Sequence, residues 1–159
     1  MDTTHVLAGW LHTIAFVIAW GYYGILARII IPALEHTLDA RARGWTLAAI
    51  ERRALRLIIL SLVLFAATGT YLLVVDPHYQ GLGNLFASTW TRLIMVKHVL
   101  VIGLVVLAGL VDWLIRRLPD PAAAPDREPT LGLIALLADG VTGLGALIAL
   151  LTVAAQSAA

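Results

Sequence analysis

The sequence contains no cysteine. This absence excludes disulfides, thiolate metal ligands and cysteine nucleophiles, and it leaves the redox compartment undetermined. Charge is also scarce, because Asp, Glu, Lys and Arg make up 13% of the 159 residues, about half the share that is typical of soluble domains. The formal net charge of +1 gives no electrostatic basis for binding nucleic acid. A soluble nucleic-acid-binding domain is therefore not expected.

What fills the sequence instead is apolar: 60% of the residues are hydrophobic, and the mean hydropathy is +0.90. A membrane-spanning helix needs about 20 residues. Four apolar segments meet that length, at about residues 4–34, 52–75, 89–118 and 130–155. We predict an all-α fold, an integral membrane four-helix bundle that forms a single transmembrane domain over residues 1–159.

The connections between these segments show where the helices should end. Pro32 is expected to mark the end of the first helix, and the charged stretch 35–51 to form the first connection. The second connection, 78–88, contains two glycines and almost no charge. The third, 119–129, contains four prolines and is expected to be irregular. No basic residue precedes the first apolar segment, so we expect that segment to be a retained helix and not a signal peptide.

Basic residues predict how the bundle lies in the membrane. Nine of the eleven Lys and Arg residues flank the first and third connections: Arg28, Arg41, Arg43, Arg52, Arg53, Arg56, Arg116, Arg117 and Arg127. Cytoplasmic connections carry an excess of Lys and Arg. We therefore expect both termini and the second connection on the non-cytoplasmic side.

Polar and small residues at helical spacing predict one inner face on each helix, since such residues turn inward in membrane bundles. On the first helix the predicted face holds His5, Ala8, His12, Ala15, Ala19 and Tyr22, and on the second Ser61 and Thr68. On the third it holds Thr91, Met95, His98, Ile102, Gly109 and Asp112, and on the fourth Gly132, Ala135, Asp139, Thr142 and Ala146.

Two histidines on these faces are the main candidates for chemistry. His12 and His98 each lie within about ten residues of the outer end of parallel helices, so at 1.5 Å per residue they share nearly the same depth. Imidazole is a common axial ligand of haem. The pair predicts a haem b held by His12 and His98. The alternative is that each imidazole only forms a hydrogen bond with a neighbouring carbonyl or hydroxyl group.

Two cations lie close to this pair in the sequence. Lys97 either extends its amine to the outer interface, which long basic side chains often do, or serves as an axial ligand or a partner of a haem propionate. Arg92 is the better candidate for the propionate, although an ordinary interface anchor would explain it equally well.

Asp139 is a further ionisable residue inside an apolar segment, where an acid costs about 2.5–3.5 kcal/mol on insertion scales. It is expected either to be protonated and hydrogen-bonded to Thr68 or Thr142, or to relay protons to a redox site. A copper site is a separate possibility, because imidazole and thioether ligands suit copper. Its candidate ligands are His5, His12, Met95 and His98.

Three segments carry a resemblance to a known family. They are Leu11-His12 with Trp20-Gly21 and Arg28, then Arg52-Arg53 with Thr68-Gly69 and Leu72, and finally Leu93 to Val101 with Lys97 inside it. In order and spacing they resemble the motifs LH…WG…R, RR…TGxxL and LxxKxxLV of the copper-resistance D (CopD) superfamily. That superfamily also includes HemJ-type protoporphyrinogen oxidases.

The resemblance implies a four-helix membrane protein tied to copper or haem. In HemJ-type proteins a helix-one His and a helix-three Lys are the important pair, and these correspond to His12 and Lys97. The sequence departs from the pattern by placing His98 directly after Lys97, and by having Asp112-Trp113 where a Tyr-His pair is expected. The departure favours His98 as a ligand.

Together these features predict a haem-binding protein of a bacterial inner membrane that transfers electrons, acting as a component or small subunit of a respiratory or photosynthetic complex. A quinone or a partner protein is the expected electron acceptor, since the chain has no soluble domain. The alternatives are a copper-binding or copper-import module, an enzyme that oxidises a porphyrinogen, and a purely structural subunit whose polar residues only set helix register.

Overall fold

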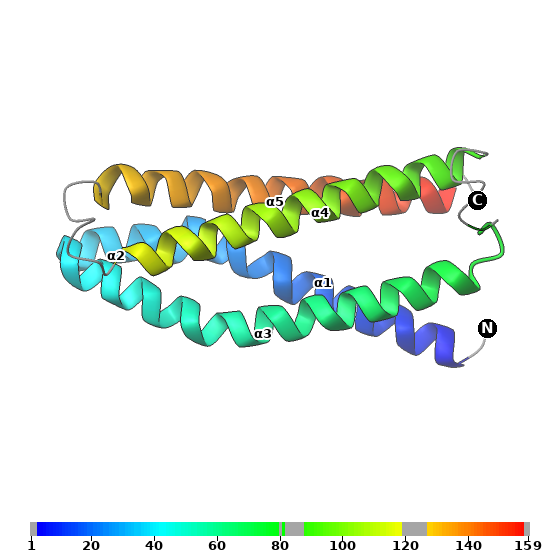
Figure 1. The fold of residues 1–159 in the computed structure, drawn as a ribbon, viewed down its shortest axis with the longest axis horizontal. Helices are drawn as coiled ribbons and strands as arrows, with labels where there is room; N and C mark the ends of the chain where they lie inside the picture. The colour runs from blue at the N-terminus through cyan, green and yellow to red at the C-terminus, as the bar shows by residue number, and fades with distance from the viewer. Residues whose placement is uncertain (1–2, 80, 82–87, 119–126, 158–159) are drawn as a thin grey trace.

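The computed structural model describes residues 3–79, 81, 88–118 and 127–157, with the side chains of 127–129 excepted. Its elements follow the order α1 (Thr3–Ile25), η1 (Leu26–Ile30), α2 (Ile31–Thr37), α3 (Ala40–Val75), α4 (Thr89–Arg117) and α5 (Arg127–Ser157). Within these ranges, four helical stretches are long and apolar enough to cross a membrane, the first running from α1 through α2. The chain is an all-α, multi-pass membrane bundle, as predicted (Figure 1).

The first transmembrane helix does not end at Pro32, and that expectation was wrong. It continues to Thr37 through the π-helical segment η1, in which the N–H of Ile31 bonds to the carbonyl of Leu26, five residues back. Pro32 then occupies the first turn of α2. Proline is tolerated there because a first-turn N–H has no intrahelical acceptor. The wider π turn thus lets the helix pass the proline.

The second transmembrane helix begins earlier than expected. The segment predicted as a charged connection, 35–51, is mostly helical, and only Leu38 and Asp39 separate α2 from α3. The Asp39 carboxylate caps α3 by accepting a hydrogen bond from the N–H of Ala42 at 2.8 Å. Gly44 and Leu47 of this segment are buried. The charged residues therefore extend a helix that packs in the bundle, where a loop was expected.

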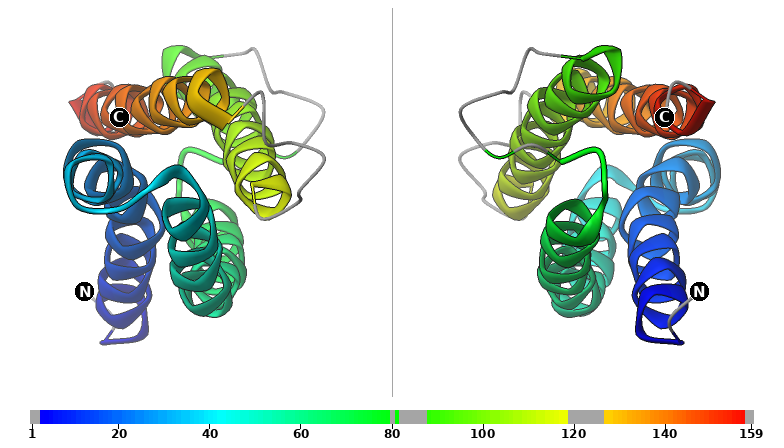
Figure 2. Two further views of the ribbon diagram at one scale, coloured as in Figure 1. Left: turned by 90° about the vertical axis from the view of Figure 1, so that its left-hand side faces the viewer. Right: turned by 90° about the vertical axis from the view of Figure 1, so that its right-hand side faces the viewer.

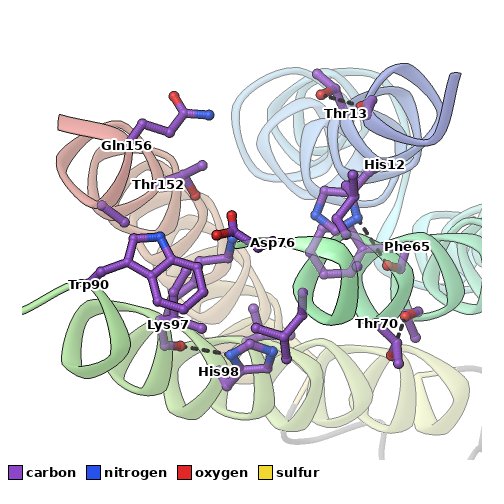
Figure 3. A pocket seen from close by; sticks show the side chains of 18 of the residues that line it. His12, Thr13, Phe65, Thr70, Asp76, Trp90, Lys97, His98, Thr152 and Gln156 are labelled. Carbon is purple, nitrogen blue, oxygen red and sulfur yellow. Dashed lines mark hydrogen bonds between the residues drawn. The ribbon is translucent and has the colours of Figure 1, made fainter. Parts of the chain in front are cut away.

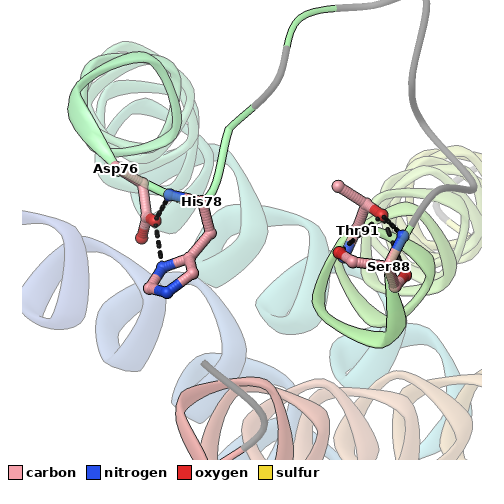
Figure 4. Close-up of polar contacts among 4 residues, drawn as sticks. All are labelled: Asp76, His78, Ser88 and Thr91. Atoms are coloured by element: carbon pink, nitrogen blue, oxygen red, sulfur yellow. Dashed lines mark hydrogen bonds and ion pairs between the residues drawn. The ribbon is translucent and has the colours of Figure 1, made fainter.

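The helix ends around the second connection are fixed by short-range hydrogen bonds (Figure 4). After α3, the carboxylate of Asp76 accepts bonds from the backbone N–H of His78 at 2.9 Å and from its ring at 3.0 Å. Before α4, Ser88 and Thr91 form a capping box, in which each side chain bonds the backbone N–H of the other. These contacts explain why α4 begins where the sequence predicted.

The helices form two closely packed pairs: α1 packs most extensively on α3, and α4 on α5. Contact between α1 and α5 joins the pairs, whereas α3 and α4 touch little. Both termini lie at the end of the bundle where α3 ends and α4 begins (Figures 1 and 2). That this end faces away from the cytoplasm stays a prediction from the basic residues.

Large apolar side chains cover the outside of the bundle. Leu60, Val63, Ile102 and Leu136 are each more than 60% exposed. A soluble protein rarely leaves so much apolar surface in contact with water, while a bilayer accepts it. The outer surface therefore fits a lipid environment.

The predicted inner faces are correct for two helices and displaced on the other two. Ala8, Ala15 and Ala19 on α1 are buried, as are Ser61 and Thr68 on α3. On α5 the buried face is one residue away from the predicted one, with Leu131, Ile134, Ala138, Val141 and Ile148. On α4, Thr91 is buried as expected, but the buried residues further along are Leu104, Ala108, Val111 and Ile115. Apolar packing, and not the polar residues, decided these two faces.

Candidate functional site

A cavity of about 460 Å³ opens among α1, α3, α4 and α5 at the end of the bundle that holds the termini. It lies where α3 and α4 touch little. Both predicted ligands line it: His12 reaches it from α1 and His98 from α4 (Figure 3). The structure therefore brings together two side chains that are 86 positions apart in the sequence.

His12 is held by the adjacent helix α3. Its Nδ1 lies 3.1 Å from the carbonyl oxygen of Phe65 and 3.1 Å from Oγ1 of Thr68. Its ring stacks on the Phe65 ring, with the centroids 4.1 Å apart. Because Phe65 and Thr68 are three residues apart, both lie on the face of α3 that contacts α1. The imidazole is thus fixed by one stacked ring and two oxygens.

Gly69 leaves the space that this arrangement needs. A Cβ atom at position 69 would lie 2.8 Å from Cε1 of His12 and 3.3 Å from its Nδ1. No real Cβ contact is that short without displacement of one partner. The adjacent pair Thr68-Gly69 therefore has two functions, since one residue bonds the imidazole and the other makes room for it.

His98 is held by its own helix. Its Nδ1 lies 2.7 Å from the carbonyl oxygen of Ile94, one turn earlier on α4. The residue is exposed while it lines the cavity, so the cavity is open to the molecular surface here.

The two imidazoles form hydrogen bonds in the same way. A carbonyl oxygen can only accept, so the Nδ1 of each ring must be the donor, and in a neutral imidazole Nε2 then carries the lone pair. Among the residues that the structure describes, neither Nε2 has a hydrogen-bond partner. Metal-binding histidines typically use this arrangement, with one nitrogen donating to a carbonyl and the other free to coordinate. The alternative prediction, hydrogen bonding to a neighbouring carbonyl, is thus correct for Nδ1 and leaves Nε2 available.

The other predicted residues divide into two groups. Lys97 and His5 line the cavity. Arg92 and Met95 are not among its lining residues, whereas His5, His12 and His98, the three histidines of the copper hypothesis, are. Within residues 3–79, 88–118 and 130–157, no three His, Asp or Glu side chains gather closely enough to hold a bare metal ion.

Asp139 lies elsewhere, and its expected hydrogen-bond partners were wrong. Its carboxylate pairs with Nε of Arg28 at 3.0 Å, across the contact between η1 and α5. Thr68 instead bonds His12, and Thr142 donates to the carbonyl of Ala138. Asp139 is half exposed and does not line the cavity. An ion pair satisfies this acid, so it did not need to turn toward the bundle interior.

Sequence reasoning gave no role to Phe65 and quoted Gly69 only as part of a motif. A signal for Phe65 was present, because Ser61, Phe65 and Thr68 follow each other at steps of four and three and so share one face. No pattern in the sequence indicated that Gly69 lies beneath the ring of His12, because that contact joins two different helices.

Comparisons of the chain with protein-family models, with curated proteins and with solved structures gave no match.

Proposed function

We propose that this protein binds a b-type haem in the cavity, with His12 and His98 as axial ligands, and works in electron transfer in a bacterial inner membrane. The observation that carries the proposal is that both imidazole rings have the same hydrogen-bonding arrangement. Each donates through Nδ1 to a backbone carbonyl and keeps Nε2 free, and both line one cavity.

The number of donors favours a macrocycle over a bare ion. A porphyrin supplies four nitrogens of its own, so two imidazoles complete the coordination of its iron. A bare copper ion in a tetragonal site would need further protein donors, and Met95 does not line the cavity. The volume of about 460 Å³ lies within the range of about 300–1,000 Å³ that is usual for ligand and cofactor pockets.

The remaining lining residues suit the two parts of such a cofactor. Phe65 and Trp90 present apolar rings to the cavity. Lys97 supplies a cation within it and is the proposed partner of a propionate. Arg92, exposed in the first turns of α4, would assist from outside the cavity. Bound haem would supply reversible one-electron chemistry, and the electrons would pass to a quinone or to a partner subunit in the membrane.

A visible spectrum of the purified full-length protein, expressed with haem supply, tests this proposal. We expect a Soret peak and a reduced alpha band, both lost in His12→Ala and in His98→Ala. His36→Ala is the matched control, because His36 is an exposed histidine on α2 at the opposite end of the bundle.

A preparation without a Soret peak, or a spectrum unchanged in both cavity variants, would overturn the proposal. Copper found by elemental analysis in such a colourless preparation would instead support the copper-binding module. A colourless preparation free of metal would support the remaining alternative, a purely structural subunit.

A second candidate is the oxidation of a porphyrinogen, and one observation favours it: Lys97 and His12, the pair that the CopD and HemJ resemblance implies, line the same cavity. Lys97→Ala should then abolish porphyrinogen oxidation while His98→Ala retains it. The haem proposal predicts that His98→Ala is the more damaging of the two.

A further inference from the structure

A carboxylic acid lies buried at the other end of the bundle. Glu51 on α3 is 1% exposed. Its Oε2 accepts a short hydrogen bond from the hydroxyl of Tyr22 on α1. Its Oε1 is buried and has no hydrogen-bond partner among the residues that the structure describes. One oxygen of this acid is therefore satisfied, and the other is buried without a partner within the described residues.

Glu51 is also one of the residues that line a second pocket. This pocket of about 280 Å³ is lined by Ala48, Glu51, Arg52, Asp112 and Arg116. Both carboxylate oxygens of Asp112 accept from Nε of Arg116, at 2.8 and 2.9 Å. Asp112 is thus neutralised by its own ion pair, whereas no ion pair holds Glu51 within the described part of the chain.

The pocket is separate from the haem cavity. The two share no lining residue. Asp112 follows His98 by 14 positions on α4, which at 1.5 Å per residue separates them by roughly 21 Å. The pocket also lies toward the end that the basic residues assign to the cytoplasm.

Burial and position set the charge of Glu51. An ionised carboxylate that is buried without a cation in contact is costly, and such groups normally take up a proton. The pocket, however, is many times larger than the volume that one water molecule needs, and its walls carry polar partners for water. The guanidinium group of Arg52 in the same walls would offset a transient negative charge, while that of Arg116 is paired with Asp112.

From this geometry we infer that Glu51 is a reversible proton-binding site, which exchanges its proton with water in the second pocket. The acid releases a proton from Oε1 to a pocket water molecule, leaving a carboxylate that Tyr22 still holds through Oε2, and the reverse step reloads it. The titratable and charged groups around it are Tyr22 and Tyr23 from α1, Arg52 from α3, and Asp112 and Arg116 from α4. The inference does not depend on the haem proposal.

Infrared spectroscopy of the full-length protein in lipid nanodiscs tests it, with transfer from H2O to D2O as the probe. We expect a carbonyl band of a protonated carboxylic acid, which shifts on transfer to D2O and is lost in Glu51→Gln. Glu35→Gln is the matched control, because Glu35 is an exposed acid on α2. That variant should retain the band.

If Glu51→Gln does not fold, Tyr22→Phe provides a second test of the inference. It leaves the acid and removes its hydrogen-bond donor, so the band should move to higher frequency. An unchanged band in Glu51→Gln, or an unshifted band in folded Tyr22→Phe, would show that the band does not come from Glu51. A band that persists unshifted for hours in D2O would show that the pocket does not connect the acid with water. Any of these three results would overturn the inference, whatever the visible spectrum of the protein is.

Discussion

The two ends of the bundle hold polar groups in different ways. At the end with the termini, His12 and His98 line a cavity of about 460 Å³, and His98 is exposed. At the other end, Glu51 is 1% exposed and borders a pocket of about 280 Å³ whose walls carry two arginines and Asp112. Each end leaves a coordinating atom free, Nε2 of the imidazoles in one case and Oε1 of the acid in the other.

The difference indicates what each end can hold. Imidazole nitrogen donors beside aromatic rings, in a larger and open cavity, suit a planar apolar cofactor with a metal at its centre. A single buried oxygen beside guanidinium groups, in a smaller pocket, suits a proton and water. The following variants should therefore change one end without changing the other.

Gly69→Ala should have the largest effect, and at the cavity end only. The added Cβ would lie 2.8 Å from Cε1 of His12, so the ring must leave its position against Phe65. We expect haem affinity to fall by about 10- to 100-fold, measured by titration of the purified protein with haem. The carboxylic acid band of Glu51 should not change.

Gly9→Ala is the control for this variant. Gly9 also lines the cavity, but a Cβ atom there meets nothing within 4 Å. If both alanine variants bind haem as the parent does, the position of His12 against α3 is not needed for binding.

Tyr22→Phe should destabilise the opposite end. It removes the donor to Oε2 and leaves Glu51 without its one hydrogen bond, which costs about 1–3 kcal/mol for a buried acceptor. Denaturation followed by circular dichroism should show this loss in the free energy of unfolding, while the haem spectrum stays the same. Tyr71→Phe on α3 provides the comparison, and equal stability of the two variants would argue against a role for the Tyr22 hydroxyl.

Thr68→Val should have a smaller effect at the cavity end. The hydroxyl is one of two partners of His12 Nδ1, and the carbonyl of Phe65 stays in place. Loss of one hydrogen bond is expected to cost about 0.5–1.5 kcal/mol, seen as weaker haem binding in the same titration. Thr70→Val is matched to it, because the Thr70 hydroxyl only bonds Ala66 of its own helix. If Thr70→Val weakens haem binding as much as Thr68→Val does, the Thr68 hydroxyl has no special role in holding His12.

Asp139→Asn should have the smallest effect. Asp139 and Arg28 pair at 3.0 Å, but both side chains are about half exposed or more, so the pair is expected to contribute at most about 1 kcal/mol. Neither the haem spectrum nor the Glu51 band should change. A loss of haem on this substitution would instead show that the ion pair of Asp139 with Arg28 is needed to form the cavity site.

Polar residues correctly indicated the buried face of a helix where they had a partner on the next helix, and did so poorly elsewhere. His12 and Thr68 face each other, as the rule for membrane bundles expects. The same rule placed Asp139 inward, although Ala138 and Val141 form the buried face of α5 and Asp139 pairs with Arg28 outside it. The rule assumes that a polar group must turn inward, and an ion pair removes that need.

Glu51 shows the opposite error. It was assigned to the end of the charged connection 35–51, directly before the predicted second helix. Yet Gly44, Leu47 and Glu51 recur at steps of three and four, and that face continues to Ile58 and Ser61 further along α3. The periodicity that would have placed Glu51 in the interior was available and was outweighed by local charge.

The sequence by itself determined the architecture, because four apolar runs of sufficient length can satisfy their backbone hydrogen bonds in lipid only as helices. It also named His12 and His98, since imidazoles stand out in apolar segments. Only the tertiary structure decided that both rings donate through Nδ1, that Gly69 makes room for one of them, and that Glu51 keeps a free oxygen. The contacts of His12, Gly69 and Glu51 join different helices, and helix periodicity does not encode the rotation and contact of one helix against another. The bond of His98 to Ile94 lies within α4 and depends on the side-chain rotamer, which the sequence does not specify either.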